Sequence, residues 1–261
     1  MNRYHSPGAF IQYISAEALG SAAVNHPYLC ALREGNLPNV DLAFKDFAFQ
    51  YGFYSTAFIR YVSAVIQNLS NAEHKQILLC NLAEEQGNNH DLDLPPDVLA
   101  SVIGQPHASL YRRLQEALGI DANYLKTTQP SQTSLSWSRQ FLQICQVNAC
   151  AGIGAIGIGT ELIVSRIYDQ ILEGLDAHSH LTMTQRVFFD LHSKCDDQHA
   201  AKLLLIAEEL AQSPTACEQI EYGTRKAIDM RVAFWDKMLE RAHGFPVSTS
   251  PSIEKLSAFE H

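Results

Sequence analysis

The sequence predicts an all-α protein with a single domain, and three observations lead to this expectation. Apolar residues recur at helical spacing along most of the 261 residues, and the alternation typical of strands is nearly absent. In addition, no stretch resembles a hinge between two cores, and no repeat of fixed period occurs. We therefore expect one helical domain over residues 1–243, followed by a poorly ordered tail rich in Pro and Ser over residues 244–261.

The expected helices follow one another with short connections. The segment 91–104, which contains Pro95-Pro96, is expected to hold only a turn or two of helix, and residues 126–133 are typical of a polar surface loop. Asn71 or Ser70 suits the N-cap of the helix that runs to Glu85. In chain order, we expect helices over residues 9–23, 27–35, 39–68, 71–85, 109–118, 135–147, 149–172, 184–193, 196–212 and 216–241.

Composition and charge limit the kinds of partner. Apolar residues make up 46% of the chain and charged residues 18%, which is typical of a globular protein. The net charge of −9 argues against nucleic acid or an anionic membrane as the main partner. The longest uncharged stretch, 140–160, is too polar and too rich in Gly for a membrane span. We expect a protein that binds a small molecule, and we leave a homodimer open.

The cysteines and the N-terminus bear on location. Six cysteines occur without a CxxC pair, and the first residues lack the apolar segment of a signal peptide. We therefore expect reduced thiols and a cytoplasmic protein. A thiol nucleophile is poorly supported, because buried cysteines such as those expected at Cys150 and Cys195 are usually inert.

The segment from His192 to His199 carries the most specific chemical signal. His192, Asp196 and His199 are separated by four and then three residues, so on a helix they lie on nearly the same face. Two imidazoles with a carboxylate suit iron, manganese or zinc, and a carboxylate-rich set favours non-heme iron. The alternative is a solvated polar stripe on an amphipathic helix.

Two further segments supply carboxylate or imidazole groups. Glu161 follows an apolar, Gly-rich run, where a buried carboxylate is costly unless it is paired or bound to a metal. Glu84 and Glu85 end a helix, with His90 just beyond it. Gly87 lets the chain fold back, so that Glu85 and His90 could face one ion. Three helices that each supply inward Glu, His or Asp match the construction of di-iron carboxylate sites.

A glycine-rich run could be mistaken for a nucleotide site. Gly152, Gly154 and Gly157 match the dinucleotide fingerprint GxGxxG. That motif needs a strand before it and a βαβ unit around it, whereas helical segments lie on both sides here. We interpret these glycines as sites where helix packs closely against helix, or backbone against substrate, and we expect no nucleotide.

A run of residues near the start of the chain carries a family resemblance: Asn25-His26-Pro27-Tyr28-Leu29, Leu32, Gly35, Leu37-Pro38, Phe44, Phe47 and Gln50-Tyr51-Gly52-Phe53-Tyr54. This run resembles the opening of the TenA/PqqC superfamily, and the resemblance covers most of the chain. It implies the heme-oxygenase-like helical fold.

The later motifs resemble one branch of that superfamily, the heme-oxygenase-like di-iron oxidases and oxygenases. The matching patterns are N-x-x-E-E-x-G…H, a mid-chain Glu and H-x-x-x-D-x-x-H. By this resemblance, the iron ligands are Glu85, His90, Glu161, His192, Asp196 and His199. Glu84 is left open in place of Glu85, because the spacing to His90 is shorter than in several members. The resemblance implies two ferrous ions (Fe2+), dioxygen as co-substrate, a bridging Glu161, and oxidation of a small organic substrate that is amino-acid-like or fatty-acid-like.

Two other functions are weighed beside this one. A metal-free TenA/PqqC-type enzyme would act on a heterocycle, in thiamin salvage or quinone oxidation. Tyr51 stands where TenA thiaminases carry an Asp, however, and the acidic chain offers no obvious basic pocket of the PqqC kind. The other function is that of a non-catalytic interaction protein, since one fold supports several functions.

Overall fold

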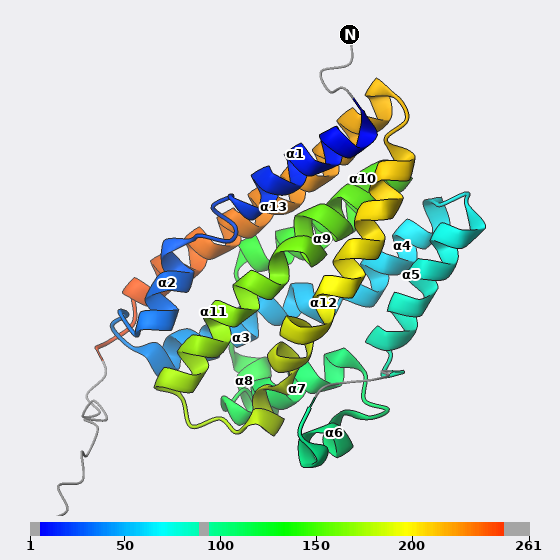
Figure 1. Ribbon diagram of the computed structural model, residues 1–261. Coiled ribbons are helices and arrows are strands. Elements are labelled where there is room, and N and C mark those ends of the chain that lie inside the picture. Colours follow the sequence, from blue (N-terminus) through cyan, green and yellow to red (C-terminus); the bar gives the residue numbers. More distant parts are fainter. Residues whose placement is uncertain (1–5, 89–93, 248–261) are drawn as a thin grey trace, which may run out of the picture.

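The computed structural model describes residues 6–88 and 94–247, and the side chains of all of these except residues 193–198. In this part of the chain every regular element is helical, and no strand occurs (Figure 1). The elements are α1 (Pro7–Leu19), α2 (Pro27–Glu34), α3 (Val40–Ser55), α4 (Phe58–Asn68), α5 (Ala72–Glu85), α6 (Pro96–Val102), α7 (His107–Ala117), α8 (Ala122–Thr127), α9 (Gln132–Val147), α10 (Ala149–Ile153), η1 (Gly154–Glu161), α11 (Leu162–His178), α12 (Met183–Leu210) and α13 (Pro214–His243). The all-α prediction is confirmed. Most of the predicted tail lies outside the described residues, so the division at residue 243 stays a prediction.

Polar side chains at the N-caps begin many of these helices. Asn71 Oδ1 accepts from the backbone N–H groups of Glu73 and His74, at 2.7 and 3.2 Å, so Asn71 caps α5. Thr182 and Gln185 form a reciprocal capping box at the start of α12. Each such bond satisfies backbone donors that the first turn of a helix leaves unpaired.

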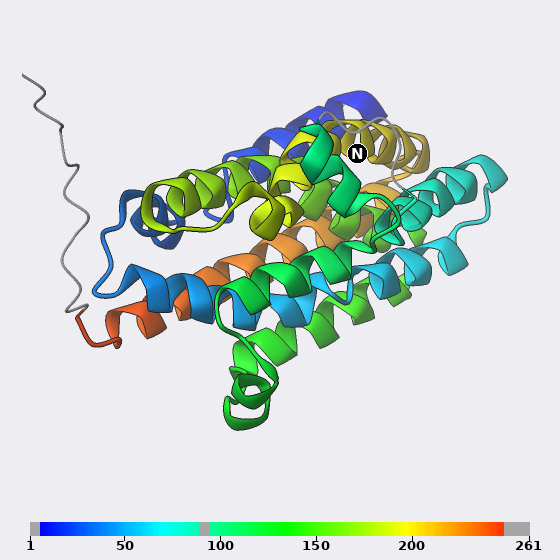
Figure 2. The ribbon, with the colours of Figure 1, turned by 90° about the horizontal axis from the view of Figure 1, so that it is seen from below.

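α10, η1 and α11 run without a break from residue 149 to 178, and this helix lies between α12 and α13 (Figures 1 and 2). η1 is a wider, π-helical stretch, and all of its residues are buried. By length and composition the helix could cross a membrane, since its most apolar window has a mean hydropathy of 1.4. That window is 78% buried inside the protein, as expected for the core helix of a bundle.

Gly154 in this helix and Gly223 in α13 let the two helices approach closely. A Cβ at residue 154 would lie 2.2 Å from the carbonyl oxygen of Ile220, and one at residue 223 would lie 1.9 Å from that of Ala151. No side chain fits at these distances. The interpretation of the glycine-rich run as a helix-packing site is therefore confirmed.

The helix expected over residues 39–68 is interrupted. α3 ends at Ser55, where the Thr56 hydroxyl donates to the carbonyl oxygen of Gly52 at 2.6 Å, and α4 begins at Phe58. Such a side-chain bond competes with the backbone ladder of the helix. Aromatic residues continue at helical spacing across the break, so periodicity alone could not detect it.

The two helices expected over residues 184–193 and 196–212 are one continuous helix, α12. The apolar pattern lapses between them because polar residues of α12 turn inward at this point: His192 is only partly exposed and His199 is buried. A pattern that looks like a helix end is here the mark of a polar interior. α8 was not expected from the sequence, and it lies in the connection between α7 and α9.

Candidate metal centre

Carboxylate and imidazole side chains from four parts of the fold gather beside the π-helical stretch. They are Glu84 and Glu85 at the end of α5, His107 at the start of α7, Glu161 at the end of η1, and His192 and His199 in α12. All except Glu84 and His192 are buried. Because buried ionisable groups are costly without partners, their gathering at one place in a helical core is unlike a solvated surface stripe.

Glu85, His107 and His192 form the tightest part of this group. His107 Nδ1 lies 3.1 Å from His192 Nε2 and 3.2 Å from Glu85 Oε1, and His192 Nε2 lies 3.8 Å from the same oxygen. Ligand atoms that each lie about 2.1 Å from one ion are roughly 3.0–3.6 Å apart. Two imidazoles and a carboxylate are also the ligand types of many non-heme iron sites. Two of the three separations lie in this range, and the third, 3.8 Å, is slightly longer, so a small movement of Glu85 would fit an iron ion to the cluster.

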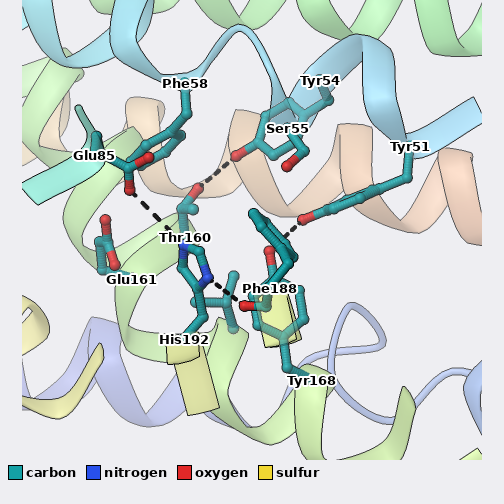
Figure 3. A pocket seen from close by; sticks show the side chains of 11 residues that line it. Tyr51, Tyr54, Ser55, Phe58, Glu85, Thr160, Glu161, Tyr168, Phe188 and His192 are labelled. Atoms are coloured by element: carbon teal, nitrogen blue, oxygen red, sulfur yellow. Dashed lines mark hydrogen bonds and ion pairs between the residues drawn. The ribbon is translucent and has the colours of Figure 1, made fainter. Parts of the chain in front are cut away.

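One hydrogen bond fixes the tautomer of His192. Its Nδ1 lies 2.6 Å from the carbonyl oxygen of Phe188, one turn earlier in α12, so Nδ1 carries the proton and donates it (Figure 3). The lone pair of Nε2 is then directed toward Glu85 and His107. A backbone carbonyl commonly orients metal-binding histidines in this way.

Gly87 places His107 beside the end of α5. Its φ of +99° lies in the left-handed region, and a Cβ there would lie 2.8 Å from the carbonyl carbon of Gln105. Glycine alone combines this conformation with such a close approach. The segment that leads into α7 therefore lies against the end of α5, which brings His107 to Glu85.

Glu84 and His199 form a second pair, with His199 Nε2 2.5 Å from Glu84 Oε2. This hydrogen bond holds the pKa of Glu84 below its ordinary value. Burial lowers the pKa of His199, but the bond to Glu84 and the charge of Glu161 outweigh burial and raise it. Without a metal, these two side chains therefore form a charged pair.

Glu161 lies within electrostatic reach of both groups. Burial raises its pKa and Glu85 raises it further, whereas His199 and His192 act in the opposite direction without cancelling the rise. Beside it, Asn81 Oδ1 is buried and has no partner among the described residues. A cation at this position would favour the ionised form of Glu161, so the orphaned oxygen and the raised pKa both fit a metal site.

A small cavity lies against this group (Figure 3). Its volume is about 30 Å³, and it is lined by Tyr51, Tyr54, Ser55, Phe58, Glu85, Thr160, Glu161, Val164, Tyr168, Phe188 and His192. One water molecule needs about 10–15 Å³ of such volume, so the cavity has room for about two. Glu85 and Glu161 form one side of it, and Tyr51 and Tyr168 form the other.

The structure brings four of the predicted ligands together. Glu85, Glu161 and His192 line one cavity, and His199 interacts with Glu161. Both Glu84 and Glu85 lie at the site, since Glu85 faces His192 and Glu84 faces His199. Their roles as ligands stay predictions.

The two other predicted ligands fall where the structure gives no side chain. Asp196 lies in α12 between His192 and His199, and its side chain is outside the described part. His90 lies outside the described residues altogether. Both stay predictions.

Sequence reasoning missed His107. This residue follows Pro106, two residues before the helix start expected at residue 109, and no other candidate ligand lies at helical spacing from it. Its place beside Glu85 depends on the contact that Gly87 makes with residues 104 and 105. That contact is tertiary, so no local pattern in the sequence could reveal it.

The family of iron-containing redox enzymes matches residues 45–232, a range that includes all the residues gathered at this site. The chain therefore belongs to this family, and it is an enzyme of the oxidoreductase type.

Two curated relatives carry a more specific name. The chain is 21% identical to a 4-aminobenzoate synthase of Chlamydia muridarum over 235 residues, which cover 89% of this chain and 91% of the relative. It is 20% identical to a protein of the same name from Chlamydia pneumoniae over 224 residues, covering 85% and 91%.

Solved structures confirm the fold. A TenA homologue of Pseudomonas syringae superposes with a TM-score of 0.69 at 14% identity, covering 88% of this chain and 91% of that one. A domain with a heme oxygenase-like fold from Shewanella denitrificans gives 0.66 at 13% identity, covering 88% and 89%. A CADD-like protein of Nostoc punctiforme gives 0.64 at 17% identity, covering 92% and 99%. The chain has the heme-oxygenase-like, TenA-like fold that the resemblance implied.

Proposed function

We propose that this chain binds two iron ions and uses dioxygen to oxidise a small organic substrate. Glu85, His107 and His192 would hold one ion, and Glu84 and His199 the other. Glu161 would lie between the two ions as the bridging carboxylate. Asp196 and His90, which the family resemblance indicates as ligands, would complete the set of iron ligands.

One observation carries the proposal. The buried Glu161 interacts with Glu85, His192 and His199 at once, and the four residues together come from three elements, α5, η1 and α12. A solvated stripe along α12 would not bring a buried carboxylate of η1 within electrostatic reach of two histidines of α12. A carboxylate-rich, partly histidine donor set of this kind suits iron better than softer metals.

Bound iron would supply the electron transfer between the substrate and dioxygen. The protein residues determine where that chemistry can occur. Phe188 holds the proton on Nδ1 of His192 and leaves Nε2 free to coordinate. Phe58 and Val164 add apolar surface to the cavity wall, which keeps bulk water out of the reaction.

The proposal does not name the substrate. The Chlamydia relatives are named for the synthesis of 4-aminobenzoate, and their identity of about one fifth supports the same general class of oxidation here. A metal-free reaction on a heterocycle is the competing function. It would leave the gathered carboxylates and histidines without a role.

Dioxygen uptake by the iron-loaded protein tests the proposal. Protein loaded anaerobically with ferrous iron and freed of excess metal is mixed with dioxygen in an oxygen electrode. We expect uptake in proportion to bound iron, and we expect His199→Ala to abolish it. His74→Ala is the matched control, because His74 is a buried histidine of α5 that pairs with Glu209 of α12 at 2.7 Å, away from the site. Uptake no greater than that of free ferrous iron would contradict the proposal.

A further inference from the structure

Arg231 is a buried cation that the proposed metal chemistry does not use. It lies in α13, and its side chain is 1% exposed. Its guanidinium carbon lies 5.4 Å from the ring centre of Tyr54 and 5.2 Å from that of Trp137. Its Nε has no hydrogen-bond partner among the described residues.

No carboxylate in the described part of the chain pairs with Arg231. The other arginines of α13 show what is usual: Arg241 binds Asp46 at 2.6 Å, and Arg225 binds Glu221 at 2.8 Å. A buried charge without a counterion is strongly unfavourable, because burial removes its water and no opposite charge replaces it. Cation–π contacts offset only part of that loss. The fold therefore retains a buried positive charge that an anionic ligand would compensate.

Two tyrosines connect this charge to the cavity. Arg231 Nη1 lies 3.4 Å from Tyr51 Oη, and Nη2 lies 3.4 Å from Tyr54 Oη. Arginine only donates, so both phenol oxygens accept from it, and each phenol can donate its own proton onward. In the structure the second partners are Tyr168 Oη, 2.8 Å from Tyr51 Oη, and Thr160 Oγ1, 3.1 Å from Tyr54 Oη.

The hydroxyl-bearing residues bonded in this way all line the cavity. The cavity therefore has two chemically different sides (Figure 3). One side carries phenol donors backed by a guanidinium, and the other carries Glu85 and Glu161. A negatively charged group is attracted to the first side and repelled from the second when no metal is bound.

We propose that the cavity recognises its substrate by a carboxylate, which accepts hydrogen bonds from Tyr51 and Tyr54 while the charge of Arg231 lies behind them. The substrate is then a carboxylic acid whose remaining atoms extend toward Glu85 and Glu161. This orientation rests on the proposed function, whereas the recognition of the carboxylate does not. A carboxylate replaces about two water molecules, which is the room that the cavity offers without rearrangement.

Pairs of acids and amides test this recognition directly. Formate and acetate, which suit a cavity of this size, are compared with formamide and acetamide at constant ionic strength, by calorimetric titration and thermal unfolding. Metal-free protein and protein loaded with ferrous iron are both used. We expect the acids to bind roughly tenfold or more tightly than their amides in both forms. Equal binding of acid and amide would overturn the proposal, and this comparison needs no variant.

Arg231→Met is the decisive variant, since it keeps an unbranched apolar stem and removes the charged guanidinium. We expect it to fold, to bind iron as the wild type does, and to lose the preference for acids. Arg225→Met, a change of an exposed arginine in the same helix, should keep that preference. If Arg231→Met still binds acids more tightly than amides, the carboxylate binds to the metal or the surface, and the proposal is wrong. The wild type could instead bind no iron and still bind acids more tightly than amides, with that difference lost in Arg231→Met. This result would contradict only the proposed function.

Discussion

His192 is oriented before any ion binds, because the carbonyl oxygen of Phe188 accepts the proton of its Nδ1. His107 contributes its own Nδ1 from another helix, 3.1 Å from Nε2 of His192. Two imidazole nitrogens at this distance either share a proton or face one cation. With Glu85 on the same side, one cation would contact all three groups at once.

His107→Ala tests the ligand that the sequence did not indicate. Removing one of three close ligands should weaken ferrous iron binding by about tenfold or more, since even residues that only support a ligand commonly contribute 10–100-fold. Competition with a chromophoric chelator under anaerobic conditions measures this affinity. His74→Ala should bind iron normally, because its pair with Glu209 lies elsewhere between α5 and α12. Normal affinity in His107→Ala would remove His107 from the site.

The ionisation of Glu161 and His199 predicts how stability depends on pH without metal. Folding raises the pKa of Glu161 above its ordinary 4.5, mainly because burial disfavours the charged carboxylate. It raises the pKa of His199 above its ordinary 6.5, because the bond to Glu84 and the neighbouring carboxylates outweigh burial. For groups shifted upward, the stabilising contribution is present at low pH and is lost as pH rises through the folded value. We therefore expect the free energy of unfolding of metal-free protein to fall as pH rises from about 5 to 8.

Metal binding should show the opposite trend, because a metal displaces protons from Glu161 and His199. Thermal unfolding with and without manganese(II), followed across the same pH range, measures both trends. The stabilisation by metal should grow with pH in the wild type and grow less in Glu161→Gln. A stabilisation that is constant with pH would mean that these two groups do not bind the ion.

The individual residues differed in how far the sequence could predict them. Helical spacing placed His192 and His199 on one face, and the cost of a buried carboxylate pointed to Glu161. Glu84 and Glu85 could not be separated, because adjacent residues on a helix point in directions about 100° apart and both can reach an interior site. His107 depended on a contact between distant segments.

At the scale of elements, the site depends on how closely α13 packs against the central helix. η1 carries Glu161 and approaches α13 at Gly154, and Gly223 of α13 lies against Ala151 of α10, just before η1. A π-helical stretch commonly marks a functional position in a helix. Any side chain between these two helices would push η1, and Glu161 with it, away from α13.

Gly223→Ala tests this packing. The new Cβ would lie 1.9 Å from the carbonyl oxygen of Ala151, so the helices must separate, at a cost of about 1–3 kcal/mol or more. Gly20→Ala is the control, because the nearest atom to its Cβ would be 3.4 Å away and its φ is negative. Chemical denaturation of both variants measures the difference. Equal stability of the two variants would show that the close approach is not required.

Helix boundaries were predictable where capping residues or glycines mark them and not elsewhere. Asn71 marks the start of α5 in the sequence and caps it in the structure. The break between α3 and α4 has no glycine or proline at its position, so aromatic periodicity carried the predicted helix through it. In α12 the sequence predicted a break that the structure does not have, since inward polar residues interrupt the apolar pattern of a continuous helix.

At the scale of the whole molecule, a bound metal would connect elements that are distant in sequence. α5, α7, η1 and α12 each supply part of the proposed ligand set. A ligand that binds only the folded state stabilises it in proportion to the logarithm of its free concentration. The same fold is found in relatives with fewer than one fifth of residues identical, so the bundle itself tolerates many sequences.

Metal should therefore raise the stability of the intact protein. At a free metal concentration about one hundred times the dissociation constant, we expect a gain of about 2.7 kcal/mol for each site. Urea unfolding with manganese(II) and with excess chelator measures the gain. Glu161→Gln should reduce it, whereas Arg225→Met should not. The absence of any gain in the wild type would mean that the gathered side chains hold no metal.

The fold and the chemical class were accessible from the sequence because both depend on patterns within single helices and on resemblance over most of the chain. The substrate was not accessible, because the cavity is built from α3, α4, α5, η1, α11 and α12 together. Arg231 illustrates this limit. Helical spacing pairs Arg225 with Glu221 in the sequence, whereas the place of Arg231 beside Tyr51 and Tyr54 depends on the packing of α13 against α3.

The number of iron ions bound by each chain tests the central claim most directly. Protein is loaded anaerobically with ferrous iron, freed of unbound metal and analysed for its elements. We predict about two iron ions per chain in the wild type and in His74→Ala, and a marked loss in Glu161→Gln. A wild type that retains no iron, or that retains the same amount as Glu161→Gln, would contradict a di-iron centre at this site.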